Sequence, residues 1–245
     1  MVQVCEDFES LRNLLFELLD SDNNYVYRGY SCQNQLLPNI IRFKDNTKNE
    51  IKILEEFEKY SGSYYNVNNA LDFLSYAQHF GLPTRLLDFS YNPFVALFFA
   101  LNSPKKESYE NEEDKMYYFI CYVDLDRHNK INEISQFGMK LKENGSYSKI
   151  CKEYFQDIEK DNKLNFMIPN YSNKRIMLQQ GLFFVPELLN NEYQNMIQEN
   201  FNIIKIHKSL RDKTLKFLDK LGFNSPKLMS DAESLCKSIK YKYEA

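Results

Sequence analysis

One segment constrains the fold of this chain more than any other, because it predicts a helix that is apolar on nearly every side. Asn92 is a typical helix cap, Pro93 suits the first helical position, and residues 94–101 read Phe-Val-Ala-Leu-Phe-Phe-Ala-Leu. A helix without a polar face is not stable at a protein surface, so other elements must cover it on all sides. We therefore expect this helix at the centre of a packed domain.

The rest of the chain mixes helical and strand patterns. Four segments have the spacing of amphipathic helices: residues 6–20, 48–60, 69–80 and 209–221. Four others have the β-branched and aromatic content of strands: residues 25–30, 85–90, 116–124 and 201–206. Because these elements do not alternate regularly, as βαβ units do, the α+β class is favoured. We expect a single domain over residues 1–245, with a peripheral polar insert around residues 127–165.

Composition excludes several classes of protein. The chain has 245 residues, a formal net charge of −3 and a pI near 5.8, which disfavours nucleic acid as a partner. Its five cysteines are scattered singly and form no CxxC pair, which fits a reducing cytoplasm better than a disulfide framework or a zinc site. The sequence shows no signal peptide and no apolar run of about 18 residues. These observations predict a cytoplasmic protein with no membrane partner and no metal.

Polar residues gather just before the apolar helix, in the stretch from Tyr76 to Ser90. His79, Arg85, Asp88 and Ser90 lie there among leucines and phenylalanines, around a Gly-Leu-Pro turn. Buried polar groups need partners, so these residues either satisfy one another or face a ligand. The alternatives are a helix-terminal imidazole for His79 and a structural ion pair between Arg85 and Asp88. The Asn92–Pro93 helix start also predicts free N–H groups that could bind an anion.

Two further clusters could contribute to a site. Tyr27-Arg28-Gly29 ends a predicted strand, where Arg28 offers a planar fork for phosphate or carboxylate and Gly29 would let a ligand approach the backbone. Arg175 precedes Gln179-Gln180-Gly181, in which the glutamines could read amides or ribose hydroxyls. The alternative for this turn is a helix C-cap with Gly181 at C′. The chain contains no P-loop, no GxGxxG, no GxSxG and no HExxH motif.

The order of these clusters resembles the FRG domain family, which is named after an aromatic-Arg-Gly motif. The likeness rests on Tyr27-Arg28-Gly29, Leu36-Leu37-Pro38 with Arg42, the block from Ala77 to Ala100, and the stretch from Arg175 to Phe183. The tail from Ile204 to Leu235 is similar as well. Bacterial members of this family are often suspected of roles in phage defence or toxicity, so the resemblance implies a defence or toxin effector.

Three segments stand in an order that carries a second, weaker resemblance: Tyr27-Arg28-Gly29, Phe89-Ser90 with the stretch from Ala96 to Ala100, and Gln179-Gln180 before Leu182. In this order they resemble ADP-ribosyltransferases of the arginine–serine–glutamate kind. This resemblance implies an ADP-ribosyltransferase-like fold with a split mixed or antiparallel sheet, a small-molecule nucleotide partner with NAD as substrate, and a protein acceptor or phage trigger as further partner. The implied catalytic residues are His79, Asp88 and Gln180. The implied cofactor-binding residues are Tyr27, Arg28, Gly29, Arg85, Ser90, Arg175 and Gln179.

The sequence departs from that second pattern at one position, because a glutamine stands where those enzymes carry their glutamate. A neutral amide stabilises a cationic ribose less well than a carboxylate does. Asp88 or Glu187 could take over this role. The alternative is a non-catalytic sensor or interaction module that recognises a nucleotide or a phage protein through the same pocket.

Overall fold

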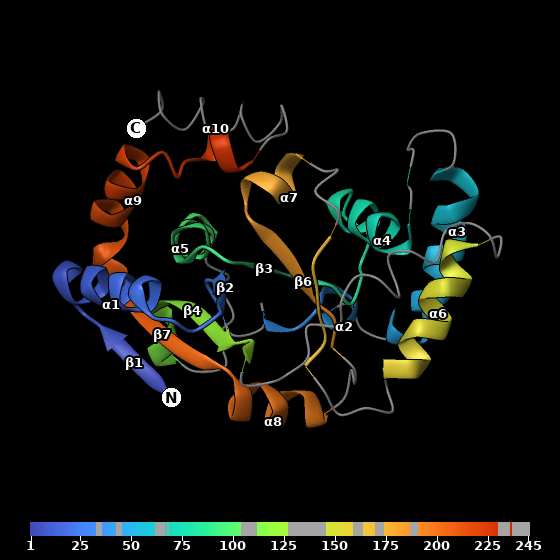
Figure 1. The fold of residues 1–245 in the computed structure, drawn as a ribbon, viewed down its shortest axis with the longest axis horizontal. Coiled ribbons are helices and arrows are strands. Elements are labelled where there is room, and N and C mark those ends of the chain that lie inside the picture. Colours follow the sequence, from blue (N-terminus) through green and yellow to red (C-terminus); the bar gives the residue numbers. More distant parts are fainter. Residues whose placement is uncertain are drawn as a thin grey trace.

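The core of the protein is one mixed sheet of seven strands, in the order β1-β7-β4-β2-β3-β6-β5 (Figure 1). The computed structural model describes residues 1–32, 36–42, 46–61, 67, 69–103, 112–126, 146–158, 164–169, 174–186, 191–229 and 236. The strands are β1 (Val2–Cys5), β2 (Tyr25–Tyr30), β3 (Leu87–Ser90), β4 (Tyr117–Asp124), β5 (Phe166–Met167), β6 (Gly181–Phe184) and β7 (Asn202–His207). Only the β1–β7 pair is parallel, and the other neighbours run antiparallel. The predicted α+β class with a mixed sheet is thus confirmed.

The sheet divides into two halves between β2 and β3. These strands are joined by a single residue pair, Tyr27 with Ser90, whereas β2 pairs with β4 along its whole length, from Tyr25 to Tyr30. Beyond that one pair, the backbones of β2 and β3 are no longer linked as a ladder. The candidate functional site lies at this point.

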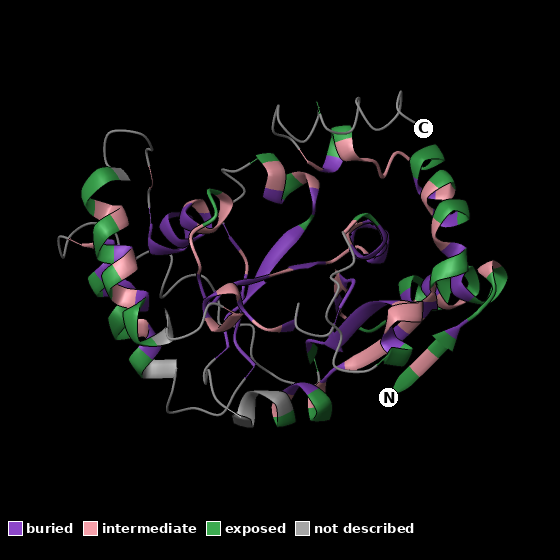
Figure 2. Ribbon diagram, turned by 180° about the vertical axis from the view of Figure 1, so that it is seen from behind, coloured by how far each residue is buried: buried purple, intermediate pink, exposed green. Residues whose placement is uncertain are grey.

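Helices surround the sheet on both faces and at its edges (Figures 1 and 2). They are α1 (Phe8–Asp20), α2 (Asn39–Arg42), α3 (Glu50–Ser61), α4 (Ala70–His79), α5 (Pro93–Asn102), α6 (Tyr147–Ile158), α7 (Lys174–Leu178), α8 (Asn191–Asn200), α9 (Arg211–Lys220) and α10 (Ser225–Leu228). Local chemistry sets their starts. The Asp7 carboxylate accepts the Ser10 N–H at 2.9 Å before α1, and Asn69 caps α4 in the same way through the Asp72 N–H. None of the helices in the described part of the chain is long and apolar enough to cross a membrane.

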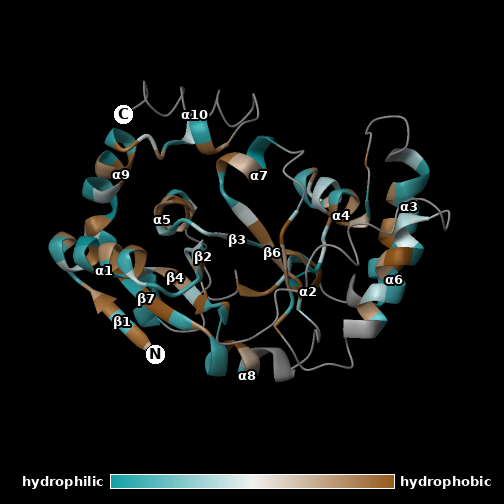
Figure 3. Cartoon of the chain, in the orientation of Figure 1, coloured by the Kyte–Doolittle hydropathy of each residue, from teal (hydrophilic) through white to brown (hydrophobic). Residues whose placement is uncertain are grey.

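Helix α5 is the buried central helix that the sequence predicts. It packs against β2 and contacts both α1 and α9, and Figure 3 colours the cartoon of these elements by residue hydropathy. The contact with β2 is unusually close at Gly29. A Cβ atom added there would lie 1.7 Å from the carbonyl oxygen of Ala96, in the backbone of α5. The structure thus gives a reason for a glycine at this position that the sequence does not indicate, which is the close approach of α5.

The other half of the sheet is covered by α3, α4 and α6, which share a second hydrophobic cluster with Phe183 of β6. Helix α6 contributes Tyr147, Ile150 and Cys151 to that cluster, and these side chains are buried. The segment at 127–165 was expected to be peripheral, yet this part of it belongs to the core. Residues 127–145 and 159–163 of the predicted insert lie outside the described residues.

The start of α6 is fixed by a carboxylate on α3. The Glu58 side chain accepts hydrogen bonds from the hydroxyls of Ser146 and Ser148, at 2.7 Å and 2.6 Å, and from the Tyr147 and Ser148 N–H groups. Burial raises the pKa of Glu58, but these hydrogen bonds outweigh it and lower the pKa below its ordinary value of 4.5. Glu58 therefore caps α6 from a neighbouring helix.

We expect Glu58→Gln to lower the free energy of unfolding at pH 7 by about 1–2 kcal/mol, because an amide accepts fewer and weaker hydrogen bonds from the α6 start. A group whose pKa is depressed by folding stabilises above its unfolded pKa and loses that contribution as the pH falls through the folded value. The difference between wild type and variant should thus shrink as the pH falls below 4.5. Urea unfolding at pH 7 and at lower pH measures it, with exposed Glu55→Gln as the control. An equal loss for both variants would contradict the capping role.

Candidate functional site

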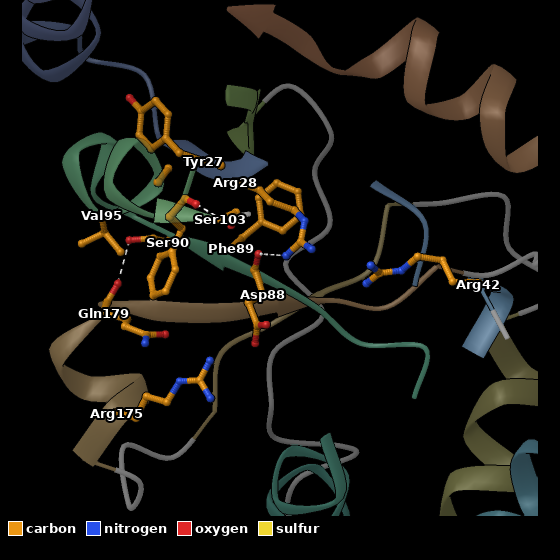
Figure 4. Close-up of a pocket in the computed structure, with 13 residues that line it drawn as sticks. Tyr27, Arg28, Arg42, Asp88, Phe89, Ser90, Val95, Ser103, Arg175 and Gln179 are labelled. Carbon is orange, nitrogen blue, oxygen red and sulfur yellow. Dashed lines mark hydrogen bonds between the residues drawn. The ribbon is translucent and has the colours of Figure 1, made fainter. Parts of the chain in front are cut away.

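Two adjoining cavities open where the sheet splits. The first, the arginine cavity, has a volume of about 220 Å³ and is lined by Tyr27, Arg28, Gly29, Arg42, Asp88, Phe89, Ser90, Val95, Ala96, Phe99, Ser103, Arg175 and Gln179 (Figure 4). The second, the polar cavity, has a volume of about 190 Å³ and is lined by Asn39, Ser75, Gln78, His79, Asp88, Arg175, Ile176, Gln179 and Phe183. Asp88, Arg175 and Gln179 line both cavities and so form the wall between them.

Arg28 reaches the arginine cavity because of the split. Its Nη1 atom donates a hydrogen bond of 2.8 Å to the Asp88 carbonyl oxygen, at a point where β2 and β3 make no ladder pair (Figure 4). The side chain thus links the two halves of the sheet. Arg28 is half-buried, and its guanidinium faces the cavity. This position holds a fixed cation at the point where the two halves of the sheet separate.

Arg42 enters the same cavity from the end of α2. That short helix is held to the segment between α4 and β3, because the Ile40 N–H donates a hydrogen bond of 3.1 Å to the Thr84 carbonyl oxygen. Burial lowers the pKa of Arg42, and the neighbouring Arg28 lowers it further. Its Nε atom is buried and has no hydrogen-bond partner among the residues that the structure describes. Burial and the nearby Arg28 therefore both disfavour the charged form of Arg42, and no described residue accepts a hydrogen bond from its Nε atom.

Asp88 supplies the carboxylate of the site, and its position is fixed by Gln78. The Gln78 amide nitrogen donates to both Asp88 carboxylate oxygens, at 3.0 Å and 2.9 Å. The Thr84 hydroxyl in turn donates to the Gln78 amide oxygen at 2.8 Å, which fixes the orientation of the amide. Figure 4 shows the Asp88 side chain pointing toward Arg175. The site thus has one oriented carboxylate beside its cations.

Arg175 and His79 contact each other at the polar cavity, which both residues line. Nη1 of Arg175 lies 3.0 Å from Nδ1 of His79. Because a guanidinium can only donate, this hydrogen bond requires Nδ1 to accept, which leaves the imidazole proton on Nε2. His79 is thus held as a neutral ring at the end of α4. The predicted alternative, an imidazole bonded to backbone, does not describe this contact.

Ser90 and Gln179 join β3 to the turn between α7 and β6. The Ser90 hydroxyl donates to the Gln179 carbonyl oxygen at 2.7 Å, and it also accepts the Asn92 N–H at 3.0 Å. The Gln179 side chain points elsewhere, because its amide donates to the Leu228 carbonyl oxygen at 2.8 Å. Ser90 therefore fixes the backbone of the site, and α10 holds the Gln179 amide.

The structure brings most of the predicted site residues together. Tyr27, Arg28, Gly29, Asp88, Ser90, Arg175 and Gln179 line the arginine cavity, and His79 lines the polar cavity. Arg85 and Gln180 line neither of them. Arg85 is buried and forms a bidentate ion pair with Glu50, with Nη2 at 2.6 Å from the carboxylate, and its guanidinium stacks on Phe155. The predicted ligand contact of Arg85, and its alternative pairing with Asp88, are both corrected by this geometry.

The turn after α7 also differs from the prediction. Gln180, and not Gly181, takes the left-handed backbone conformation, with φ at 47°. Its side chain is exposed, and its carbonyl oxygen accepts the Tyr91 N–H at 3.0 Å. Gly181 instead begins β6, where a Cβ atom would lie 3.2 Å from the Ile176 side chain. The predicted roles of Gln180 in catalysis and Gly181 as C′ residue are therefore not supported by the turn geometry.

The start of α5 offers no anion site. The Asn92 side chain accepts the Phe94 N–H at 2.9 Å, and the Asn92 carbonyl oxygen accepts the N–H groups of Val95 and Ala96. Pro93 has no N–H group. The donors expected to be open are thus already used, which corrects the prediction for this helix start.

Several site residues were not selected from the sequence. Arg42 carried a signal, since it completes the Leu-Pro-x-x-x-Arg element, but nothing in that spacing shows that it turns toward Arg28. Gln78 lies within the polar stretch, yet its role depends on the position of Asp88 ten residues later. Asn39 and Ser75 carried no signal, because each is a common polar residue in an ordinary helical context.

The comparisons with known proteins bear on the family of the chain. Residues 23–109 match the model of the FRG domain family. The match includes Tyr27-Arg28-Gly29, Arg42 and the block from Ala77 to Ala100, and it confirms the predicted family resemblance over this part of the chain. Arg175 lies outside the matched residues, although it lines the same cavities. Neither the curated proteins nor the solved structures gave a significant match.

Proposed function

We propose that the arginine cavity binds a phosphate-bearing nucleotide, with NAD as the leading candidate, and that the protein cleaves NAD or transfers its ADP-ribose. The observation that carries this proposal is the convergence of Arg28, Arg42 and Arg175 on one cavity, in whose described lining Asp88 is the one carboxylate. An anion bound among three guanidinium groups in a partly buried site would be strongly attracted by them. A guanidinium fork matches the oxygens of phosphate bidentately.

The size of the site supports a ligand larger than phosphate. The cavities of 220 Å³ and 190 Å³ adjoin, and together they reach the range of ligand sites, about 300–1,000 Å³. A diphosphate would lie among the arginines, with the rest of the ligand passing Asp88. This arrangement supports a dinucleotide or a nucleotide diphosphate better than a simple inorganic anion.

Asp88 is the residue that we assign to the chemistry. In NAD cleavage the bond between ribose C1′ and the nicotinamide nitrogen breaks, and its electron pair leaves with nicotinamide. The ribose becomes oxocarbenium-like, and a carboxylate beside it stabilises the positive charge. Water, or a nucleophile on a protein acceptor, then forms the new bond to C1′ and loses its proton. In this scheme Gln78 orients Asp88, and the role expected of Gln180 passes to Asp88.

The binding half of the proposal is tested by Arg42→Gln. We expect this variant to bind NAD at least about tenfold more weakly, because a charge-assisted hydrogen bond contributes roughly 1.5–3 kcal/mol. Its free energy of unfolding should stay unchanged or rise, since the buried Nε atom without a partner and the repulsion from Arg28 are both removed. Calorimetric titration and urea unfolding measure the two quantities. Exposed Arg12→Gln, on α1, is the matched control.

A contrary outcome for Arg42→Gln is clear-cut. If the variant loses stability and keeps its NAD affinity, Arg42 is a structural residue and the anion site is not where we assign it. If Arg12→Gln weakens NAD binding equally, the effect is one of net charge and not of the cavity.

The second candidate is a non-catalytic module that recognises a nucleotide or a phage protein. One observation favours it: the Gln179 amide is bonded to Leu228 and Gln180 is exposed, so the turn after α7 contributes no acidic group to the cavity. Such a module would bind NAD or ADP-ribose without releasing nicotinamide. A role in defence or toxicity stays a prediction under either candidate, and an infection assay with the Arg28→Ala variant would examine it.

A further inference from the structure

The two adjoining cavities differ in chemistry. Three guanidinium groups surround the arginine cavity. The residues that belong to the polar cavity alone are mostly neutral hydrogen-bonding ones, with Asn39, Ser75 and Gln78 beside the neutral His79 ring. A ligand that fills both cavities must therefore carry its anionic part and its uncharged, hydrogen-bonding part on opposite sides of Asp88.

Ser75 is the most telling residue of the polar cavity. It lies in the middle of α4 and is only 7% exposed, yet its hydroxyl makes no hydrogen bond with any residue in the described part of the chain. A serine in a helix usually bonds back to a carbonyl of the preceding turn or reaches solvent. Ser75 makes no such bond to the preceding turn, and it lines the polar cavity. Its hydroxyl is therefore open to a ligand in that cavity.

Asn39 faces the same cavity from the start of α2. Its side chain is half-buried, and it too has no hydrogen-bond partner within the described ranges. The neighbouring groups are already engaged, since the Gln78 amide binds Asp88 and Thr84, and Nδ1 of His79 binds Arg175. Among the described residues that line the polar cavity, Ser75 and Asn39 are thus the polar side chains that make no hydrogen bond to another described residue.

We propose that the polar cavity is a ribose subsite, in which Ser75 and Asn39 hydrogen-bond the hydroxyls of a ribose whose phosphate lies among Arg28, Arg42 and Arg175. This inference rests on the proposed function. It adds that recognition of the ribose hydroxyls lets the site distinguish ribonucleotides from deoxyribonucleotides and from inorganic phosphate. Ribose carries adjacent hydroxyls that both donate and accept, which matches one hydroxyl and one amide. Asp88, in the wall between the cavities, then lies beside the ring that links phosphate to base.

The experiment compares three small probes by calorimetric titration of the full chain: inorganic phosphate, ribose 5-phosphate and 2-deoxyribose 5-phosphate. We expect ribose 5-phosphate to bind at least about tenfold more tightly than the deoxy sugar, because a missing hydroxyl leaves buried polar groups unpaired. Ser75→Ala should reduce that ratio to within about twofold and leave the affinity for inorganic phosphate unchanged. Ser10→Ala, on the exposed face of α1, is the matched control.

Each outcome separates the two proposals. If phosphate binds and is weakened by Arg42→Gln, but the sugar hydroxyls make no difference, the ribose subsite is wrong and the anion site stands. If the ribose preference exists but survives Ser75→Ala and Asn39→Ala, the subsite lies elsewhere and the inference fails. If none of the probes binds, and NAD and ADP-ribose do not bind either, the proposed function itself fails. Urea unfolding of Ser75→Ala, expected to match wild type or exceed it in stability, shows that any loss is not a loss of fold.

Discussion

Replacing Gly29 by alanine is expected to abolish the native fold, or to lower the free energy of unfolding by more than about 4 kcal/mol. The added Cβ atom would lie 1.7 Å from the Ala96 carbonyl oxygen and 2.7 Å from the Ala100 nitrogen. Both atoms belong to the backbone of α5, which is enclosed by the core and cannot move aside as a flexible side chain could. Helix α5 would have to leave β2, and the cluster of buried apolar side chains that α5 shares with α1 and α9 would open.

Gly81→Ala is the matched control for this prediction. Gly81 has a φ of 91°, and an added Cβ atom would have no neighbour within 4 Å. Alanine there is strained only by its backbone conformation, at a cost of about 1–2 kcal/mol. Urea unfolding and circular dichroism of the two variants measure the difference. If Gly29→Ala is as stable as Gly81→Ala, the close packing of α5 on β2 is wrong.

The second large effect concerns Asp88. We expect Asp88→Asn to lower the rate of nicotinamide release from NAD by at least about a hundredfold, because the amide cannot stabilise a cationic ribose. NAD affinity should change by less than about threefold, since the three arginines that we assign to phosphate binding remain. The fold should also remain, because an asparagine oxygen can still accept the hydrogen bond from the Gln78 amide. Asp22→Asn, in an exposed loop, serves as the control.

The outcome for Asp88→Asn separates the two candidate functions. A release rate that does not change with the substitution would remove Asp88 from the chemistry. If wild type binds NAD but releases no nicotinamide, the non-catalytic module is the better description. If Asp88→Asn lowers both NAD affinity and the rate of nicotinamide release, Asp88 acts by positioning the residues that bind NAD.

Local patterns in the sequence predicted much of the fold. The apolar run after Pro93, the cap at Asn92 and the amphipathic spacing of α1 each depend on neighbouring residues, so the chain itself reveals them. Strands β1 and β5 were missed, because they have four and two residues and are defined by distant partners. Helix α8 was missed as well, because its sequence of Asn, Gln and Glu has little apolar periodicity.

The candidate site was predictable in its parts but not in its arrangement. Arg28 and Asp88 were recognisable as polar residues next to strands, yet their contact depends on the way β2 and β3 separate. Arg85 and Glu50 form their ion pair across 35 positions of sequence, which no local spacing indicates. Ser75 is notable because it is buried and lines the polar cavity, and both are properties of the folded protein alone.

The most direct test of the central claim is a calorimetric titration of the wild-type chain with NAD and with ADP-ribose at low ionic strength. The convergence of Arg28, Arg42 and Arg175 predicts saturable binding of both ligands, competition by inorganic pyrophosphate, and weaker binding as salt is added. No binding of NAD, ADP-ribose or pyrophosphate at millimolar concentration would contradict the assignment of this cavity as a nucleotide site.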